Sequence, residues 1–564
     1  MLNPLPFAWR KPLVHLALFL AAIYLYALLM EHFGGFSTAV MYLQWPEALV
    51  VLYVYGLIYA LLKPSPWRPW LAGAPIFLLY LTHDVFYLVY GKVFRLINMA
   101  ELPELLQILP TLYAVLLVVF FLTPLILILV RIDYHRPLRI LVALLPLALV
   151  VTLIKATPDA FATGFRTFAY EIVKYSDGKS VETNGRLAMM LFREAEREKT
   201  LQSIQPYLNR PGYDKAFTGE VERLRPYLQP RNVHLLILES FLDPRLFRDL
   251  KLSRDPVHPD FAALFGDQLG LSIAPVFGGA TSQAEFEVLC GVPALERLSS
   301  VEFNTFTGAP ARCLPDLLGQ LGYRAVASNA YKPNFFNTQS AYKGMGFAEQ
   351  YFAEEFLPRE VTYLKFGDPG TEEYIFDSDL LPQNLEFVRR HLQEHPDQPL
   401  FNYLLTIFGH TPHNEDLDKH PRIIEVESAY ADEHLVRVVN HFYYRTQALA
   451  AYVRELLAID PDSLIVLVSD HVPPLQFGPP TYQALAYMNN IEGNHFYNRL
   501  AILDRGKPVS FDPMRHFDLP KLVMNDLTQG HYCQAGDCEY LLKSKPGRDD
   551  YFDKYLALMA HASE

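Results

Sequence analysis

Residues 277–289 read Phe-Gly-Gly-Ala-Thr-Ser-Gln-Ala-Glu-Phe-Glu-Val-Leu, a glycine-containing loop that runs into a helical pattern. Ser282 and Glu285 fit a capping box, in which two side chains satisfy free backbone groups at a helix start. Thr281, one residue earlier, is then expected at a helix N-terminus, where unpaired N–H groups and the helix dipole favour a phosphate. Metal coordination lowers the pKa of a hydroxyl and makes it nucleophilic. We therefore predict that Thr281 forms a covalent phospho-enzyme.

The sequence around this loop predicts an α/β domain over residues 231–564. From residue 232 onward, short apolar runs of β type alternate with amphipathic helical stretches, which is typical of a mostly parallel sheet. In open α/β sheets, ligands bind outside the carboxyl ends of the strands, so polar residues at those ends are candidates for one crevice. Four apolar runs end in or lead to such residues: Glu239, Ser328 and Asn329, His410, and Asp470 and His471.

The strand-end residues also form a metal-binding set. A carboxylate from Glu239 and the pair Asp470-His471 supply oxygen ligands and an imidazole, and the Thr281 hydroxyl adds a fourth donor. These donors suit Mn²⁺, Mg²⁺ or Zn²⁺. We expect one divalent ion, with Mn²⁺ as the first choice. Taken alone, Glu239 fits a helix cap equally well, and Asp470-His471 fits a surface turn.

The composition changes near residue 156. Before that point, apolar runs with few charges dominate, and a helix needs about 20 mostly apolar residues to cross the hydrocarbon core. The first run is too long for an ordinary signal peptide, so we interpret it as a retained anchor. We predict a five-helix transmembrane bundle over residues 1–156. Its five spans cover residues 12–32, 45–63, 69–91, 108–130 and 137–155.

Short loops predict the orientation, because Lys and Arg accumulate on the cytoplasmic side. Arg10 and Lys11 precede the first span, and Lys63 and Arg68 separate the second from the third. Five spans and a cytoplasmic N-terminus place the rest of the chain outside. We therefore predict a multi-pass protein of the bacterial inner membrane with a periplasmic or extracellular catalytic domain. Residues 157–230 mix helical patterning with turn formers and predict a juxtamembrane helical linker.

The third span contains His83 and Asp84, where a charge is costly unless it is paired or faces a polar cavity. The pair fits a hydrogen bond between packed helices or a lipid-headgroup site, and the packing interpretation is favoured. Both stay open at the level of sequence.

The net charge and the cysteine content exclude some classes of partner and of structural site. The net charge is −12 and we find no basic block, which argues against nucleic acid. Four cysteines, none in a CxxC pair, make no disulfide framework or zinc knuckle. Cys533 and Cys538 fit a local disulfide if the domain lies outside the cytosol. Cys290 and Cys313 fit buried thiols or a second bridge.

Four segments occur in the order and rough spacing seen in lipoteichoic acid synthases and related phosphoglycerol transferases. They are NVHLLILES at 232–240, GGATSQAEFEVLCG at 278–291, FGHTP at 408–412 and LVSDH at 467–471. The chain thus resembles this branch of the alkaline phosphatase/sulfatase superfamily, and the five-span anchor matches as well. The resemblance implies a sulfatase-like outer domain. It assigns the metal ligands to Glu239, Thr281, Asp470 and His471, the nucleophile to Thr281, and a substrate-site histidine to His410.

The same resemblance implies a reaction. Thr281 would attack the phosphorus of an anionic glycerophospholipid, with phosphatidylglycerol as the first choice, and release diacylglycerol. The phosphoglycerol group would then pass to a hydroxyl of a glycan or polyol acceptor. His410 would contact the phosphoryl group or move a proton.

The chain departs from the family pattern on the substrate side. Where the family has an aromatic-Asn-Arg triplet, this chain has Phe336-Asn337-Thr338, so the arginine that would grip phosphoglycerol is absent. Lys332 or Lys343 would supply the charge without a bidentate fork. The substrate-binding candidates are Ser328, Asn329, Lys332, Phe336, Asn337 and His410.

Other functions share this chemistry. Phosphoethanolamine transferases also have five spans and a threonine nucleophile, but their cysteine-rich disulfide set is missing here. A sulfatase would present a Cys or Ser in a C/S-x-P-x-R context, which the nucleophile loop lacks. Hydrolysis stays open because water can replace the acceptor. A non-catalytic membrane sensor that keeps the fold is the remaining alternative, and failure to bind metal would identify it.

Overall fold

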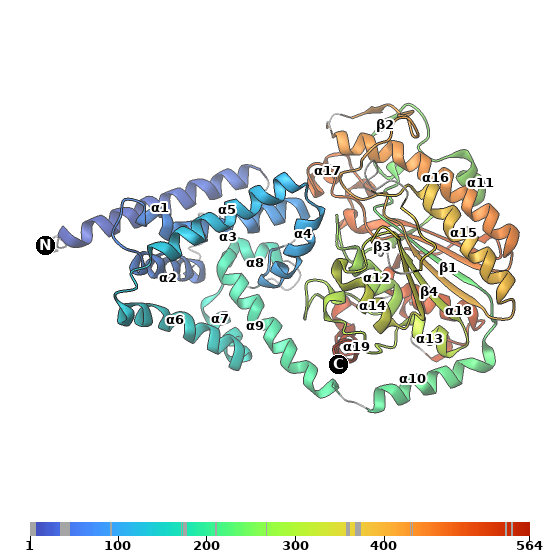
Figure 1. The fold of residues 1–564 in the computed structure, drawn as a ribbon, viewed down its shortest axis with the longest axis horizontal. Helices are drawn as coiled ribbons and strands as arrows, with labels where there is room; N and C mark the ends of the chain where they lie inside the picture. The colour runs from blue at the N-terminus through green and yellow to red at the C-terminus, as the bar shows by residue number, and fades with distance from the viewer. Residues whose placement is uncertain are drawn as a thin grey trace. The chain divides into compact units, whose positions relative to one another are not determined.

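The chain forms two compact units, Met1–Gln202 and Ser203–Glu564, in the computed structural model (Figure 1). The division falls inside the predicted linker of residues 157–230. The structure describes residues 7–564 except 34–35, 37–44, 91–92, 171, 173–176, 209–210, 267, 357–360, 367–373, 429, 431, 536–537 and 543–544.

The first unit is helical. Each of the five predicted spans forms an apolar helix, and four of these are long enough to cross a membrane, whereas α2 has 17 residues. The side chains of α5 are all at least partly exposed in the described part of the chain, as expected for a helix that faces lipid. The apolar helices are α1 (Phe7–His32), α2 (Trp45–Leu61), α3 (Arg68–Tyr90), α5 (Thr111–Arg131) and α6 (Pro137–Ala156). The shorter or more polar ones are α4 (Leu102–Ile108), α7 (Pro158–Phe168), α8 (Asp177–Asn184) and α9 (Arg186–Ile204).

Buried charges connect α9 to the apolar helices. Arg186 donates from Nε and Nη2 to the two carboxylate oxygens of Asp84 at 2.7 and 3.1 Å. Glu47 of α2 accepts from the Tyr80 hydroxyl at 2.5 Å and from the Ala188 backbone N–H at 2.8 Å. Asp84 is thus a partner between helices, which favours the packing interpretation of this position.

The second unit is an α/β domain built on a mixed, mostly parallel sheet, as predicted. In the described residues the nine strands follow the order β11-β3-β9-β8-β1-β6-β4-β5, with β10 beside β9. Strands β8, β1, β6, β4 and β5 are parallel, whereas β9 is antiparallel to β8 and β3. Strand bounds are β1 (Val233–Leu238), β3 (Gly270–Ile273), β4 (Arg324–Asn329), β5 (Glu349–Phe352), β6 (Leu400–Leu405), β8 (Leu464–Ser469), β9 (Tyr497–Asp504), β10 (Lys507–Pro508) and β11 (Met514–Arg515); β2 (Lys251–Leu252) pairs separately with β7 (Val426–Glu427).

Helices cover both faces of this sheet, with α11, α15 and α16 on one side and α12, α13 and α14 on the other (Figure 1). Strands β1, β6 and β8 are buried along their whole length, which explains why their sequences are nearly continuous apolar runs. Helix bounds are α10 (Pro211–Leu224), α11 (Pro259–Phe265), α12 (Thr281–Cys290), α13 (Leu314–Gln320), α14 (Thr338–Met345), α15 (Asp377–Glu394), α16 (Glu433–Ile459), α17 (Pro479–Ala484), α18 (Leu519–Leu527) and α19 (Phe552–Ala562).

Two disulfides link the cysteines. Cys533 and Cys538 close a short loop, which confirms the local bridge. Cys290 and Cys313, which the sequence left open, form the second. It joins the last residue of α12 to the residue before α13.

Candidate metal and nucleophile site

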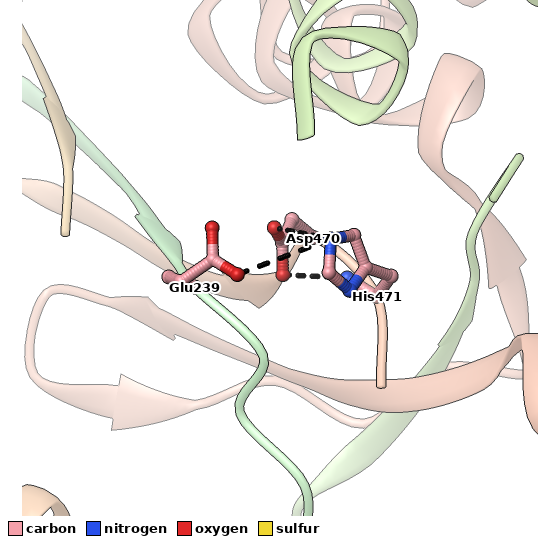
Figure 2. A group of neighbouring side chains, drawn as sticks. All are labelled: Glu239, Asp470 and His471. Atoms are coloured by element: carbon pink, nitrogen blue, oxygen red, sulfur yellow. Dashed lines mark hydrogen bonds and ion pairs between the residues drawn. The ribbon is translucent and has the colours of Figure 1, made fainter. Parts of the chain in front are cut away.

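Two neighbouring strands bring the predicted acidic ligands together. Leu238 of β1 pairs with Ser469 of β8 in parallel register, so the residues that follow, Glu239 and Asp470, leave the sheet at equivalent positions. His471 comes next, and the three side chains face one another (Figure 2). Their ligand atoms all lie within 4.8 Å of one another, and each residue is buried.

Thr281 is the first residue of α12 and joins this group. Its Oγ1 donates to Glu239 Oε2 at 3.0 Å and lies 3.4 Å from Nε2 of His471. The residue before it, Ala280, has left-handed backbone angles and no side-chain hydrogen bond to the helix start. The predicted capping box is therefore wrong: Ser282 is the second helical residue, and the cap position has a side chain without oxygen. The first-turn N–H groups stay without a side-chain cap beside the Thr281 hydroxyl.

The electrostatics of the site favour a bound cation. Burial raises the pKa of Asp470 to about 6, and burial followed by the Asp470 charge raises the pKa of Glu239. Asp470 Oδ1 accepts from the Ser240 and His471 backbone N–H groups at 2.7 and 2.6 Å. Its Oδ2 is buried, accepts no hydrogen bond among the described residues, and lies 3.2 Å from Nε2 of His471. Two buried carboxylates and an imidazole this close fit a divalent ion, which would neutralise their charge.

His410 lies in the loop after β6. It is half-buried, and its Nδ1 lies 2.6 Å from the Thr411 carbonyl oxygen, so this nitrogen is an N–H donor. The His410 ring is 5.0 Å from the ring of Tyr374. It lies close enough to Glu239 that its positive charge would lower the pKa of that carboxyl.

A buried arginine that was not predicted from the sequence contacts the backbone of Glu239. Arg445 of α16 donates from Nη1 to the Glu239 carbonyl oxygen at 2.7 Å and from Nε to Asp377 Oδ2 at 2.6 Å. Gly409 packs against the same groups, and a Cβ there would overlap both the Glu239 carbonyl and the Arg445 guanidinium. An arginine within the apolar pattern of a long helix is the signal that could have identified Arg445.

The predicted substrate-binding residues of the β4 region are largely engaged within the protein. Ser328 is buried and its Oγ lies 2.6 Å from the Tyr363 hydroxyl. Asn329 donates from Nδ2 to the Tyr342 hydroxyl at 3.0 Å. These contacts tie the end of β4 to its neighbours.

In the segment after β4, some predicted substrate-binding residues are buried or hydrogen-bonded and others are exposed. Asn337 donates from Nδ2 to two backbone carbonyls, at 2.8 Å each, and Phe336 is buried. Lys332 is half-buried, with Nζ 5.3 Å from the centre of the Tyr331 ring, and Lys343 is exposed. The two lysines thus supply the positive charge of this segment.

Known proteins match this part of the chain. Residues 231–510 match the family described as Sulfatase. A Rhizobium meliloti (strain 1021) protein named for cyclic beta-1,2-glucan modification is 28% identical over 266 residues, which cover 46% of this chain and 38% of that protein. A Haemophilus influenzae protein, described as uncharacterized, is 25% identical over 188 residues, which cover 32% and 33%. The alignments thus span less than two-fifths of these curated relatives.

Solved structures are similar as well. The Streptococcus pyogenes phosphoglycerol transferase GacH, in complex with sn-glycerol-1-phosphate, has a TM-score of 0.46 at 17% identity and covers 64% of this chain and 92% of its own. The lipoteichoic acid synthase LtaP from Listeria monocytogenes has a TM-score of 0.43 at 19% identity, with coverage of 55% and 78%. The family match covers every strand of the sheet except β11 and all four converging residues, so residues 231–510 of this chain form a sulfatase-family domain.

Proposed function

We propose that this protein is a metal-dependent membrane phosphotransferase that moves a phosphoglycerol-type headgroup from a phospholipid to a glycan or polyol hydroxyl. The observation that carries the proposal is the Thr281 hydroxyl, placed 3.0 Å from Glu239 and 3.4 Å from His471 at a helix N-terminus. A hydroxyl among candidate metal ligands, at a helix start without a side-chain cap, is placed to attack phosphorus.

Glu239, Thr281, Asp470 and His471 would hold the cation, and Mn²⁺ is our first choice ahead of Mg²⁺ and Zn²⁺. When bound, a divalent cation lowers the pKa of the Thr281 hydroxyl and neutralises charge on the phosphoryl oxygens. The protein keeps an acceptor for the hydroxyl proton in place, since Thr281 already donates to Glu239 Oε2.

The reaction proceeds in two displacements. In the first, the bond between Thr281 Oγ1 and phosphorus forms, the bond from phosphorus to the diacylglycerol oxygen breaks, and that oxygen takes up a proton. In the second, the acceptor hydroxyl attacks the same phosphorus, loses its proton, and releases Thr281 with its proton restored. His410 is the residue that we assign to contact the phosphoryl group and move protons, because Nδ1 is committed to the Thr411 carbonyl and Nε2 is left for the substrate.

Three observations support a lipid donor and an outer location. Four apolar helices are long enough to supply a membrane anchor in the same chain as the catalytic domain. Lys and Arg in the short loops favour a cytoplasmic N-terminus and an outer catalytic domain in the inner membrane of a bacterium. Two disulfides favour an oxidising compartment. A glycan acceptor is supported by the name of the Rhizobium meliloti relative.

The experiment compares the full chain with Thr281→Ala in detergent with Mn²⁺. Each is incubated with headgroup-labelled phosphatidylglycerol or phosphatidylethanolamine, and diacylglycerol release and protein-bound label are measured. We expect both signals from phosphatidylglycerol, with turnover at least about 10⁴-fold lower in Thr281→Ala. Release from phosphatidylethanolamine alone would reassign the headgroup, and free headgroup phosphate without an acceptor would indicate hydrolysis. If Mn²⁺ binds and neither lipid is cleaved, the phospholipid donor is refuted.

A further inference from the structure

Helix α12 carries a buried carboxylate that the proposed reaction does not use. Glu285 lies four residues after Thr281, about one helical turn away, and is 1% exposed. Its Oε1 accepts a hydrogen bond from the Tyr403 hydroxyl at 2.6 Å and a second one from the Tyr342 hydroxyl. Two phenols therefore converge on a single oxygen of this side chain.

The hydrogen bonds extend from this oxygen to the sheet. Tyr403 is in β6, next to β1, whose end carries Glu239. Tyr342 is in α14 and accepts from Asn329 Nδ2, at the end of β4, at 3.0 Å. Both tyrosines are fully buried, and their rings meet edge to face at 5.8 Å. Glu285 thus connects the nucleophile helix to β6 directly and to β4 through Tyr342.

Burying this carboxylate costs free energy that an apolar side chain would not. Burial raises the pKa of Glu285 to about 7, although the two phenols oppose this shift. Its Oε1 partners are hydroxyls and not cations, so the hydrogen bonds offset only part of the desolvation cost. A polar group kept at such a cost is explained when it fixes a geometry that a non-directional apolar contact cannot fix.

The start of α12 needs such a constraint. It follows Gly278 and Gly279, both with positive φ, and Ala280 in the left-handed region. No side-chain cap fixes the first turn within the described residues. The Thr281 hydroxyl lies about 4 Å from the helix axis, so a rotation of about 15° would move it by about 1 Å. A misplacement of about 1 Å can cost about 10²-fold in rate.

We propose that Glu285 is a positioning residue for Thr281: its hydrogen bonds from Tyr342 and Tyr403 fix the rotation of α12 and so hold the nucleophile against the metal ligands. This inference rests on the proposed function of Thr281. It adds to that function a role for Glu285, whose hydrogen bonds connect α12 to the sheet.

Glu287 provides a matched control. It is on the same helix and fully buried, but its Oε1 accepts from the Ala294 backbone N–H at 2.9 Å and from Arg548, toward the far end of α12. Replacing either glutamate by Leu removes a buried carboxylate and leaves donors unpaired. Glu287→Leu also breaks the ion pair with Arg548, so it should be destabilised at least as much as Glu285→Leu. Only the change at 285 should misplace Thr281.

The test uses full-length wild type, Glu285→Leu, Glu285→Gln and Glu287→Leu in detergent with Mn²⁺. We expect Glu285→Leu to lower kcat by about 10- to 100-fold with KM within twofold. Glu285→Gln should recover most of kcat, because its amide oxygen still accepts from the phenols. Glu287→Leu should keep the wild-type kcat although its unfolding temperature is no higher than that of Glu285→Leu. Equal kcat in Glu285→Leu and Glu287→Leu would overturn the inference while leaving the proposed function intact.

A second readout does not depend on turnover. Amide hydrogen exchange of residues 281–284 should speed up in Glu285→Leu and stay at the wild-type rate in Glu287→Leu, whose changes should fall beyond residue 286. Unchanged exchange at 281–284 in Glu285→Leu would refute the positioning role. If the wild type cleaves no phospholipid, the proposed function fails, and the exchange data still decide whether Glu285 holds α12.

Discussion

Replacing Asp470 by Asn should stabilise the metal-free protein and abolish its response to metal. Asp470 is fully buried, and burial raises its pKa to about 6 from an ordinary value of 3.8. Because the folded pKa is the higher one, the stability that this group contributes is present below pH 3.8 and is lost as the pH rises through 6. At pH 8 the ionised group therefore costs the folded state about 3 kcal/mol, which a neutral amide would not.

The substitution preserves the shape of the site. An Asn oxygen can still accept from the Ser240 and His471 backbone N–H groups, as Asp470 Oδ1 does at 2.7 and 2.6 Å. The amide nitrogen would take the place of Oδ2, which has no hydrogen-bond partner among the described residues. The change thus removes a charge and a metal ligand without opening a cavity.

Unfolding of the full chain in detergent, with and without chelator, provides the assay. Without metal, the free energy of unfolding of Asp470→Asn should exceed that of the wild type by up to about 3 kcal/mol at pH 8. This difference should vanish near pH 4. Mn²⁺ at 100 times its Kd should stabilise wild type by about 2.7 kcal/mol and leave Asp470→Asn unchanged.

Asp460→Asn is the control. Burial raises the pKa of Asp460, but hydrogen bonds from His234 and Asn232 lower it further, so the net pKa is below its ordinary value. Its ionised form therefore stabilises the fold, and Asp460→Asn should destabilise it at pH 8. The reasoning is refuted if Asp470→Asn is less stable than wild type at pH 8 without metal, or if Mn²⁺ stabilises both proteins equally.

Three further predictions concern other parts of the chain. Asp84→Asn leaves buried Arg186 without its anionic partner and should destabilise the helical unit by about 3–5 kcal/mol, seen as earlier thermal unfolding in detergent. Replacing Cys290 and Cys313 by Ser opens a loop with a sequence separation of 23. The free energy of unfolding, measured in urea, should fall by about 3 kcal/mol. Reductant should cause the same loss in the wild type, and it should cause no further loss from this bridge in the variant. Burial, followed by the neighbouring Glu296 charge, raises the pKa of Glu302 to about 7. The free energy of unfolding should therefore fall as the pH rises from 4.5 to 7, and Glu302→Gln should remove about 3 kcal/mol of that fall in a pH series of unfolding measurements.

The strands and the ligands at their ends could be predicted from the sequence. Buried parallel strands are nearly continuous apolar runs, so β1 and β8 stand out, and the polar residues that follow them mark one edge of the sheet. The sequence left the order of the strands open, and the parallel pairing of β1 with β8 in the structure brings Glu239 and Asp470 together. Thr281 was found because a glycine loop before a helix is a local pattern.

The supporting contacts could not be predicted, because they join positions far apart in the chain. Arg445 meets the Glu239 carbonyl across 206 positions, and Tyr403 meets Glu285 across 118. Neither pairing leaves a local signal, although an arginine within the apolar pattern of α16 marks Arg445 itself as a residue with a buried partner. The capping box failed for a related reason: the left-handed Ala280 depends on the fold around the glycine loop, whereas the capping pattern considers only neighbouring residues.

The bridge between Cys290 and Cys313 makes the link at the C-terminal end of α12 depend on the redox state of the compartment around it. Disulfides do not persist in a reducing cytosol. With the outer location that we propose, α12 would gain this link only after export, and a domain still in the cytosol would carry Thr281 on a helix that is tethered at fewer points. The proposed nucleophile would then be fully held on one side only of a membrane whose two leaflets both contain phospholipid.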